Sequence, residues 1–254
     1  MAPRVQKRFE NKIAVVTGAG QGMGKQVAMD LAAEGAKVVV TDIVPELIEE
    51  VCKEIEQCGG KCMSVICDVT SSEQIDRMIQ KTIDAFGRVD ILINNAGLLI
   101  PGTIEETSDE LIDKTLDINV KGVLYAIRAV TPLMKKQRYG RIVNVSSITG
   151  KRGDNSTIFV YGASKGAVIS LTRSAARQLG PFGITVNAIA PHAVMTSLMS
   201  YWDEEKKREV AEQIPVKRLG TVEDISCLMM FLASDESSFI TGETININGG
   251  YYMD

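Results

Sequence analysis

The sequence predicts a single doubly wound α/β domain over residues 1–254, with helices on both faces of a parallel sheet. Three observations predict this class. Short β-branched runs alternate with longer stretches of helical periodicity, the runs are continuously apolar like strands buried on both faces, and the first run leads into a glycine-rich turn. No linker, internal repeat or low-complexity tract divides the chain.

Each predicted element rests on one of two periodicities. Runs rich in valine and isoleucine predict strands, and apolar positions that recur every three or four residues predict helices. In chain order the strands are 13–16, 37–41, 63–67, 91–93, 141–145, 185–189 and 243–247, and the helices are 26–34, 46–58, 72–86, one long or broken region at 108–135, and 163–179. Glycines mark the returns from helix to strand, where a helix end favours a left-handed residue. These glycines are Gly35, Gly59, Gly60, Gly87, Gly140 and Gly183.

The composition excludes several classes of protein. Apolar residues make up 45% and charged residues 24% of the chain, which excludes a disordered chain and a disulfide-rich miniprotein. Acidic residues number 32 against 28 basic ones, so nucleic acid is not the expected partner. No apolar run approaches the roughly 18 residues of a membrane span, and residues 1–12 lack the apolar core of a signal peptide. We therefore expect a cytoplasmic protein without a membrane partner.

The five cysteines are Cys52, Cys58, Cys62, Cys67 and Cys227. An odd number in a long chain indicates reduced thiols. The first four follow at intervals of 6, 4 and 5 residues, which matches no C-x-x-C pair, and no histidine lies near them. We therefore expect buried thiols in an ordinary core and no metal site.

A glycine-rich turn over residues 17–24 follows the first strand. The common spacing G-x-G-x-x-G fails because position 23 is Met23, and the spacing is instead G-x-x-x-G-x-G from Gly18, Gly22 and Gly24. Glycines let the backbone approach a pyrophosphate, whose charge meets the amides of the following helix. Tight packing would also explain the turn, but its place between a strand and a helix favours phosphate binding.

The second strand is followed by Asp42, which lies 18 residues beyond Gly24. A carboxylate there accepts hydrogen bonds from both hydroxyls of an adenosine ribose and repels a 2′-phosphate. The turn offers Gln21 and no cation, and Ile43 follows the aspartate where Lys or Arg would indicate NADP. These residues favour NAD as the cofactor, with a solvated carboxylate as the plain alternative.

Beyond these features, the chain resembles the short-chain dehydrogenase/reductase family along nearly its whole length, which implies a Rossmann-type domain. The glycine turn alone is moderately specific, whereas the ordered set of short motifs is highly specific. The matching motifs are 17–24, Cys67-Asp68-Val69, Asn94-Asn95-Ala96-Gly97, Ile118-Asn119-Val120, Ser146-Ser147, Tyr161-Gly162-Ala163-Ser164-Lys165, 191–196 and Ile247-Asn248-Gly249-Gly250.

The resemblance implies a catalytic set and a cofactor-binding set. Tyr161 is expected to be the acid/base, Lys165 its cationic neighbour, and Ser147 the hydroxyl that orients the substrate. Asn119 is expected to anchor a water that relays protons. In the same way, Asp68 and Val69 are expected at the adenine ring, Asn95 at the adenosine, and Val194 and Thr196 at the nicotinamide. The full cofactor-binding set is Gly18, Gln21, Gly22, Met23, Gly24, Asp42, Ile43, Asp68, Val69, Asn95, Tyr161, Lys165, Val194 and Thr196.

The residue types support the catalytic roles independently of the resemblance. Tyr161 and Lys165 are four positions apart on a predicted helix and share a face. An ammonium within about 5 Å of a phenol lowers its pKa from about 10 toward a range useful for proton transfer. Ser147 follows the strand 141–145, at the carboxyl edge where open α/β sheets bind ligands. A solvated helix face is the usual alternative for such a pair, and the accompanying motifs disfavour it.

The substrate side has fewer signals. The resemblance places residues 98–103, 148–160 and 197–216 around the substrate. The stretch 196–216 contains Met199, Tyr201 and Trp202 before a charged run, and we expect either an amphipathic lid over the substrate or an ordinary surface helix.

Three further residues are candidates for substrate contact. Lys151 and Arg152 follow Ser147 closely and either receive a carboxylate, phosphate or sulfonate or remain solvated. His192, the single histidine, stands where the resemblance leads one to expect a glycine after Pro191. It either touches the substrate or is a structural variation that points to solvent or packs on the lid.

Together these features predict an NAD-dependent dehydrogenase or reductase for a small or medium secondary alcohol and its ketone, with no metal required. An anionic substrate remains open. A non-catalytic NAD-binding regulatory protein is one alternative, although it would be expected to lose Tyr161 or Lys165. An NAD-dependent epimerase or dehydratase is another, although a longer chain would be expected. The resemblance also implies a homo-oligomer, often a tetramer, and the apolar stretch Tyr251-Tyr252-Met253 suits an interface.

Overall fold

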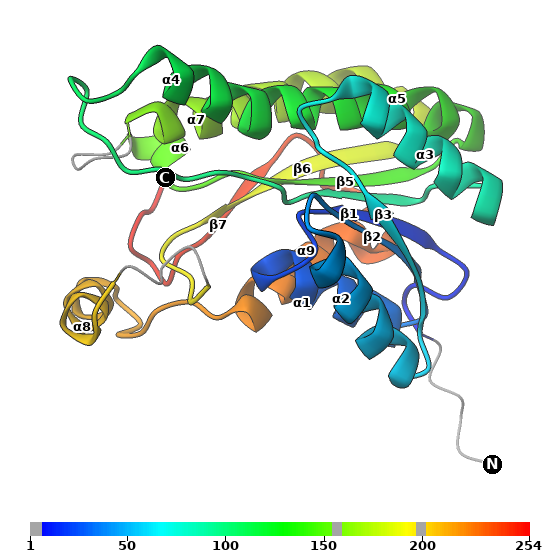
Figure 1. Cartoon of the computed structure of the whole chain (residues 1–254), viewed down its shortest axis with the longest axis horizontal. Coiled ribbons are helices and arrows are strands. Elements are labelled where there is room, and N and C mark those ends of the chain that lie inside the picture. The colour runs from blue at the N-terminus through cyan, green and yellow to red at the C-terminus, as the bar shows by residue number, and fades with distance from the viewer. Residues whose placement is uncertain (1–6, 154–158, 197–201) are drawn as a thin grey trace.

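The structure is a computed structural model that describes residues 7–153, 159–196 and 202–254. Its centre is a seven-stranded parallel sheet in the order β3-β2-β1-β4-β5-β6-β7 (Figure 1). The chain builds outward from β1 to β3 on one side and from β4 to β7 on the other, so the predicted doubly wound class is confirmed. The strands are β1 (Ile13–Thr17), β2 (Lys37–Asp42), β3 (Lys61–Ile66), β4 (Ile91–Asn94), β5 (Gly140–Val145), β6 (Ile184–Pro191) and β7 (Thr244–Ile247).

Helices cover both faces of this sheet (Figure 1). One face carries α1 (Gly22–Ala33), α2 (Pro45–Gln57) and α9 (Val222–Ala233), and the other carries α3 (Ser72–Phe86), α5 (Gly122–Gln137) and α7 (Phe159–Leu179). The shorter helices α4 (Asp109–Leu116), α6 (Thr149–Arg152) and α8 (Glu204–Gln213) follow the carboxyl ends of β4, β5 and β6. Within the described residues, no helix has the length and apolar character needed to cross a membrane.

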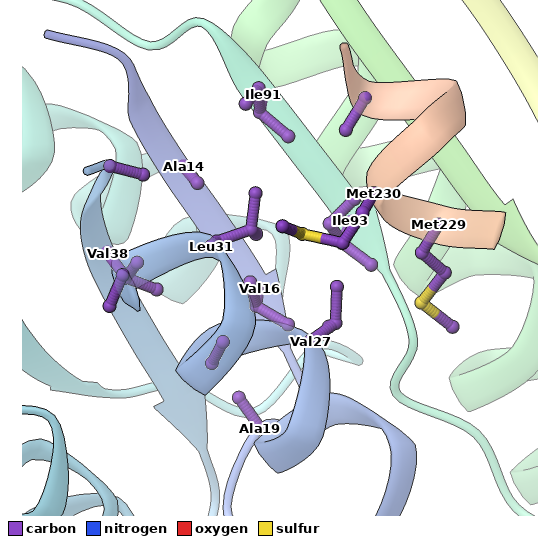
Figure 2. Close-up of a cluster of buried hydrophobic side chains, with 14 of the residues drawn as sticks. Ala14, Val16, Ala19, Val27, Leu31, Val38, Ile91, Ile93, Met229 and Met230 are labelled. Atoms are coloured by element: carbon purple, nitrogen blue, oxygen red, sulfur yellow. The ribbon is translucent and has the colours of Figure 1, made fainter. Parts of the chain in front are cut away.

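An apolar core lies on each side of the sheet. Neighbouring side chains of β1 point to opposite faces, so Val16 joins the core under α1, whereas Val15 joins the core under α3 and α5. Figure 2 shows the first core, where Leu31 of α1 and Met230 of α9 lie around Val16 and Ile93 of the sheet. Burial on both faces is the reason why the strands show no polar alternation.

The structure confirms the order of the predicted elements and moves several boundaries. α1 begins at Gly22 and α7 at Phe159, both earlier than the predicted starts at 26 and 163. The predicted helical region 108–135 is broken by a π-helical turn, η1 (Asp117–Lys121). No sequence pattern predicts α9, because its residues are mostly apolar and no single 3.6-residue stripe stands out from them.

The prediction of a glycine at every helix end is wrong at two positions. Gly35, Gly59, Gly87 and Gly183 have a positive φ as predicted, and Gly60 and Gly140 do not. After α5, Arg138 takes the left-handed position with a φ of 56°, and Gly140 begins β5. A Cβ added to Gly140 would lie 2.5 Å from Met134 Sδ, so close packing rather than turn geometry requires this glycine.

Cys52 and Cys62 form a disulfide, so the interpretation that all cysteines are reduced is wrong. The bond joins α2 to β3, with the two Cα atoms 5.3 Å apart. The two cysteines meet because a left-handed turn at Gly59 reverses the chain between the helix and the strand. Cys67 is buried as expected, and burial raises the pKa of its thiol to about 11, whereas Cys58 and Cys227 are exposed.

The disulfide predicts the number of reactive thiols. Protein denatured without a reductant is expected to show three thiols with Ellman's reagent, from Cys58, Cys67 and Cys227, and the full set of five cysteines only after reduction. The Cys52→Ser variant releases Cys62, so its thiol count without a reductant should exceed that of the unmodified protein by one. Equal counts before and after reduction in the unmodified protein would contradict the bond.

Candidate active site

Ser147 lies just past the carboxyl end of β5 and marks one side of the site. The residue is 8% exposed, and its Oγ accepts a hydrogen bond from Thr149 N at 3.2 Å. The next residue, Ile148, donates its N–H to Pro191 O at 3.0 Å, which joins this turn to the end of β6. The carboxyl ends of two neighbouring strands therefore frame the site, as expected for an open α/β sheet.

Tyr161 and Lys165 come from the first turns of α7 and meet Ser147. The Ser147 hydroxyl lies close enough to the Tyr161 hydroxyl to favour its ionised form. Lys165 is 3% exposed, and its Nζ lies 5.5 Å from the centre of the Tyr161 ring. The same ammonium donates a hydrogen bond to Val145 O at 2.8 Å, at the end of β5. The structure thus brings the predicted Ser147, Tyr161 and Lys165 together at one point.

Burial governs the protonation of this pair in the protein alone. The loss of water raises the pKa of Tyr161 to about 12, although the Ser147 hydroxyl opposes the rise. Burial also lowers the pKa of Lys165 to about 8. The predicted lowering of the Tyr161 pKa is therefore wrong for the chain alone, because burial penalises the charged form of each residue.

Asn119 lies in the π-helical turn η1 and is fully buried. Its Oδ1 accepts a hydrogen bond from Leu98 N at 2.7 Å, and its Nδ2 donates to Leu98 O at 2.9 Å and to Ser164 Oγ at 3.0 Å. Ser164 Oγ in turn donates to Tyr161 O at 2.7 Å. The side chain therefore ties the loop after β4 to the first turn of α7, and the water that it is expected to anchor stays a prediction.

Close backbone contacts shape the glycine-rich turn. A Cβ added to Gly24 would lie 2.2 Å from Gly18 O, and one added to Gly18 would lie 2.7 Å from Ala96 Cα, so neither position accepts a larger residue. Gly22 opens α1 with a left-handed φ of 57°. Asn95 Nδ2 donates to Gly18 O at 2.8 Å and holds the turn against the end of β4.

A groove beside this turn has the composition expected for a dinucleotide. The N-cap residue Gln21 makes no side-chain capping bond to α1, and no acidic residue lies in the first turn, so the start of this helix suits an anion. In the described part of the chain, the buried Asn95 Oδ1 has no hydrogen-bond partner and suits a donor from a ligand. Asp42 Oδ2 accepts a hydrogen bond from Gly20 N at 3.2 Å. The lining residues are Gly18, Gln21, Gly22, Met23, Asp42, Asn95, Ala96, Gly97 and Thr196.

Several predicted cofactor residues do not line this groove. Asp68 follows β3, and its carboxylate accepts hydrogen bonds from Thr70 N and Oγ1 at 2.9 and 2.8 Å. Val69 is buried, and Val194 is buried in a bridge beside the end of β6. Ile43 is 63% exposed next to the groove. Contact of these side chains with adenine or nicotinamide stays a prediction.

The predicted lid is described in part. Trp202 and α8 belong to it, whereas Met199 and Tyr201 lie outside the described residues. α8 is charged over most of its surface, and its buried Val210 packs with Ala193, two residues beyond β6. This part of the segment is therefore helical with one buried apolar residue, and both an amphipathic lid and an ordinary surface helix stay open.

The three further candidates for substrate contact, Lys151, Arg152 and His192, meet residues of the segment 251–254. The His192 ring stacks on Tyr251, with the ring centres 4.0 Å apart. The Arg152 guanidinium lies 5.2 Å from the centre of the same ring, and Lys151 Nζ pairs with Asp254 Oδ2 at 2.6 Å. His192 does not have a positive φ, so it fits an ordinary backbone conformation where the resemblance expects glycine.

The sequence patterns did not predict that Tyr251 and Asp254 contact these three candidates. Tyr251 is expected at a subunit interface, yet its ring packs inside the chain, and Met253 is the exposed member of that stretch at 75%. The one signal of this contact in the sequence is His192 itself, because a ring at a position where glycine is expected needs another side chain to pack against. Ala96 and Gly97 belong to a matched motif but had no assigned role, and they line the groove.

Comparisons with known proteins agree with this fold and site. A family model described as enoyl-(acyl carrier protein) reductase matches residues 18–252. The 3-oxoacyl-[acyl-carrier-protein] reductase FabG of Staphylococcus epidermidis is 40% identical over 244 residues, which are 96% of this chain and 100% of the relative. FabG of Thermotoga maritima is 38% identical over 243 residues, 96% and 98% of the two chains. The crystal structure of levodione reductase matches with a TM-score of 0.92 and 31% identity, covering 96% of this chain and 98% of that chain. The chain belongs to the short-chain dehydrogenase/reductase family.

Proposed function

We propose that the protein is an NAD(H)-dependent oxidoreductase that interconverts a small or medium secondary alcohol and its ketone, with Tyr161 as the acid/base. The observation that carries the proposal is the meeting of the Ser147 and Tyr161 hydroxyls beside the buried Lys165. The named relatives are reductases, and the 3-oxo group in the name of one of them is a ketone. The intact Tyr161 and Lys165 disfavour a regulatory protein without activity.

The geometry supports proton transfer at a carbonyl oxygen. The glycine-rich turn and Asp42 would hold NADH in the groove, and this cofactor would supply the hydride for the carbonyl carbon. The Tyr161 hydroxyl gives its proton to the carbonyl oxygen and becomes a phenolate, while Ser147 donates a hydrogen bond to the same oxygen. The Lys165 ammonium stabilises the phenolate by its charge. In the reverse direction, the phenolate would take the alcohol proton while the hydride of the carbinol carbon passes to oxidised NAD.

The protonation state of Tyr161 favours reduction at neutral pH. With a pKa of about 12, the hydroxyl is protonated in the free enzyme and ready to act as the acid. Alcohol oxidation requires the phenolate, whose fraction grows as the pH rises toward the pKa. The proposed enzyme therefore works as a ketone reductase near neutral pH and as an alcohol dehydrogenase under alkaline conditions.

Asp42 supports NAD(H) as the cofactor. Its carboxylate lines the groove with the glycine-rich turn, and the groove lining contains no lysine or arginine among the described residues. A 2′-phosphate would meet this negative charge without a compensating cation, whereas two ribose hydroxyls would donate to it. The exposed Ile43 beside it offers an apolar surface for the adenine ring.

We also propose that the protein is a homo-oligomer with the groove between α5 and α7 as a subunit contact. Leu124 is 46% exposed in this groove, and small side chains such as Ala167 and Ser170 of α7 let a second helix approach closely. Figure 1 shows both helices on the outer side of the sheet, where a second copy can pack its own α5 and α7 by two-fold symmetry.

The acid/base role predicts a selective loss of turnover in Tyr161→Phe. The ring remains but its proton is lost, so kcat should fall by at least roughly 10²-fold while NADH binding, followed by fluorescence, is retained. The matched control is Tyr139→Phe, because this tyrosine bonds to Asp235 away from the site and should keep near-normal turnover. In the unmodified enzyme, alcohol oxidation should rise with pH. Near-normal kcat in Tyr161→Phe would refute the role.

The cofactor argument predicts a change of preference in Asp42→Ala. Loss of a charged acceptor should raise the KM for NADH by roughly tenfold and improve kcat/KM with NADPH, because a repelling charge is also removed. The exposed Asp76 of α3 provides the control Asp76→Ala, which should change neither value. A preference of the unmodified enzyme for NADPH would show that Asp42 does not select the cofactor.

The subunit contact predicts the effect of Leu124→Arg. A charge in the apolar groove should reduce the mass measured by size-exclusion chromatography with light scattering, without loss of the helical circular dichroism signal. The control Ile66→Arg places the same charge at another exposed apolar residue, on the edge strand β3, and should leave the mass unchanged. The contact would be contradicted if the unmodified protein is a monomer, or if Leu124→Arg leaves the mass of the oligomer unchanged.

A further inference from the structure

The last residues of the sequence fold back onto the loop that carries Ser147. Figure 1 shows the chain returning from β7 to end beside α6. Tyr251 is held between two side chains there: its ring stacks on His192 at 4.0 Å with an interplanar angle of 16°, and the Arg152 guanidinium lies 5.2 Å from its centre. This segment therefore links α6 to the end of β6.

This link borders the candidate active site. Ile148 N bonds to Pro191 O at 3.0 Å, so Ser147 and His192 are each one residue away from the same hydrogen bond. Tyr251 also packs against the apolar cluster that contains Val210 of α8. The segment thus contacts both the loop that carries Ser147 and the apolar cluster of α8.

Lys151 is a buried cation in this arrangement. Its side chain is 10% exposed, and its Nζ lies 2.6 Å from Asp254 Oδ2. The other oxygen, Asp254 Oδ1, accepts a hydrogen bond from Asn246 Nδ2 at 2.6 Å. An ammonium and an amide therefore hold the two oxygens of one planar carboxylate, and the ammonium lowers the pKa of that carboxyl group.

The carboxylate is the exposed member of the pair. The Asp254 side chain is 46% exposed against 10% for Lys151, so the carboxylate leaves toward water more easily than the lysine does. An ammonium on a side chain largely withdrawn from water is stabilised by an anion, so another anion would be favoured beside Lys151 when Asp254 moves away. Among the described residues, Arg152 has no ion pair and adds a second positive charge beside Tyr251.

We propose that Lys151 and Asn246 bind the carboxylate of an anionic substrate, a keto acid or hydroxy acid, and that Asp254 occupies this site in the free enzyme. This inference rests on the proposed function and narrows its substrate class. When the substrate carboxylate replaces Asp254, Tyr251 moves with its segment, and the apolar contact with α8 changes. The two-oxygen geometry favours a carboxylate over a tetrahedral phosphate or sulfonate.

The experiment compares a keto acid with its neutral ester. Reduction of acetoacetate and of methyl acetoacetate is followed by NADH absorbance, and the ratio of the two kcat/KM values is measured. The unmodified enzyme should favour the acid. Lys151→Gln should lower the ratio by roughly tenfold or more through KM, since a charged hydrogen bond is lost. Asp254→Asn should raise the ratio by up to about fivefold, because the internal competitor is removed.

The opposite signs separate recognition from stability. Loss of structure lowers the rates for both ketones and leaves the ratio of the two kcat/KM values unchanged. Removal of the competing carboxylate in Asp254→Asn should raise this ratio, whereas removal of the binding ammonium in Lys151→Gln should lower it. The control Lys12→Gln removes another lysine that pairs with a carboxylate, at the amino end of β1 and away from the site, and should keep the ratio of the unmodified enzyme. A ratio unchanged in Lys151→Gln and Asp254→Asn would overturn the proposal.

A binding measurement without cofactor completes the test. Trp202 is the single tryptophan and packs against the same apolar cluster as Tyr251, so its emission should change when acetoacetate is titrated. The change should need less acetoacetate in Asp254→Asn and be absent in Lys151→Gln. If the Trp202 emission changes at the same acetoacetate concentrations in Asp254→Asn and Lys151→Gln, the proposal is overturned. If both ketones are reduced and Lys151→Gln leaves the ratio of kcat/KM values unchanged, this inference alone is refuted. If neither ketone is reduced, the proposed function is refuted as well.

Discussion

The candidate site depends on the hydrogen bond from the Lys165 ammonium to the Val145 carbonyl. A cation that is 3% exposed must have an acceptor, and this one lies at the end of a central strand. The bond fixes α7 against β5, so Tyr161, one turn earlier, faces Ser147. Ser146 Oγ adds a second tie by donating to Lys165 O at 2.9 Å. The site geometry therefore follows from how one helix is seated on one strand.

The same burial determines the charges of the site. Without water, the phenol of Tyr161 keeps its proton and the ammonium of Lys165 loses its proton more readily, with pKa values of about 12 and 8. With these pKa values the pair carries a single positive charge at neutral pH, and the Val145 carbonyl accepts the hydrogen bond of that cation. Because a pyrophosphate and a nicotinamide bring their own charges, the protonation of this pair is coupled to whatever occupies the groove beside it.

Much of the fold and part of the site could be predicted from local patterns. The strands β1 and β2 are runs of valine and isoleucine, and α3 has a strong apolar stripe with Ser71 at its N-cap and Gly87 at its end. Tyr161 and Lys165 share a face because they are four positions apart. The π-helical turn at Asn119 could not be predicted, because one extra residue in a helical turn barely alters the apolar periodicity.

The sequence by itself determined the alternation of strands and helices, the place of the glycine-rich turn, and the residue types at the carboxyl edge of the sheet. These features depend on neighbours along the chain. Only the tertiary structure decided the Cys52–Cys62 bond, the raised pKa of Tyr161 and the contacts of Tyr251 and Asp254 with α6. Each of these depends on the distance between segments far apart in sequence or on the exclusion of water, and both arise only when the two faces of the sheet are packed.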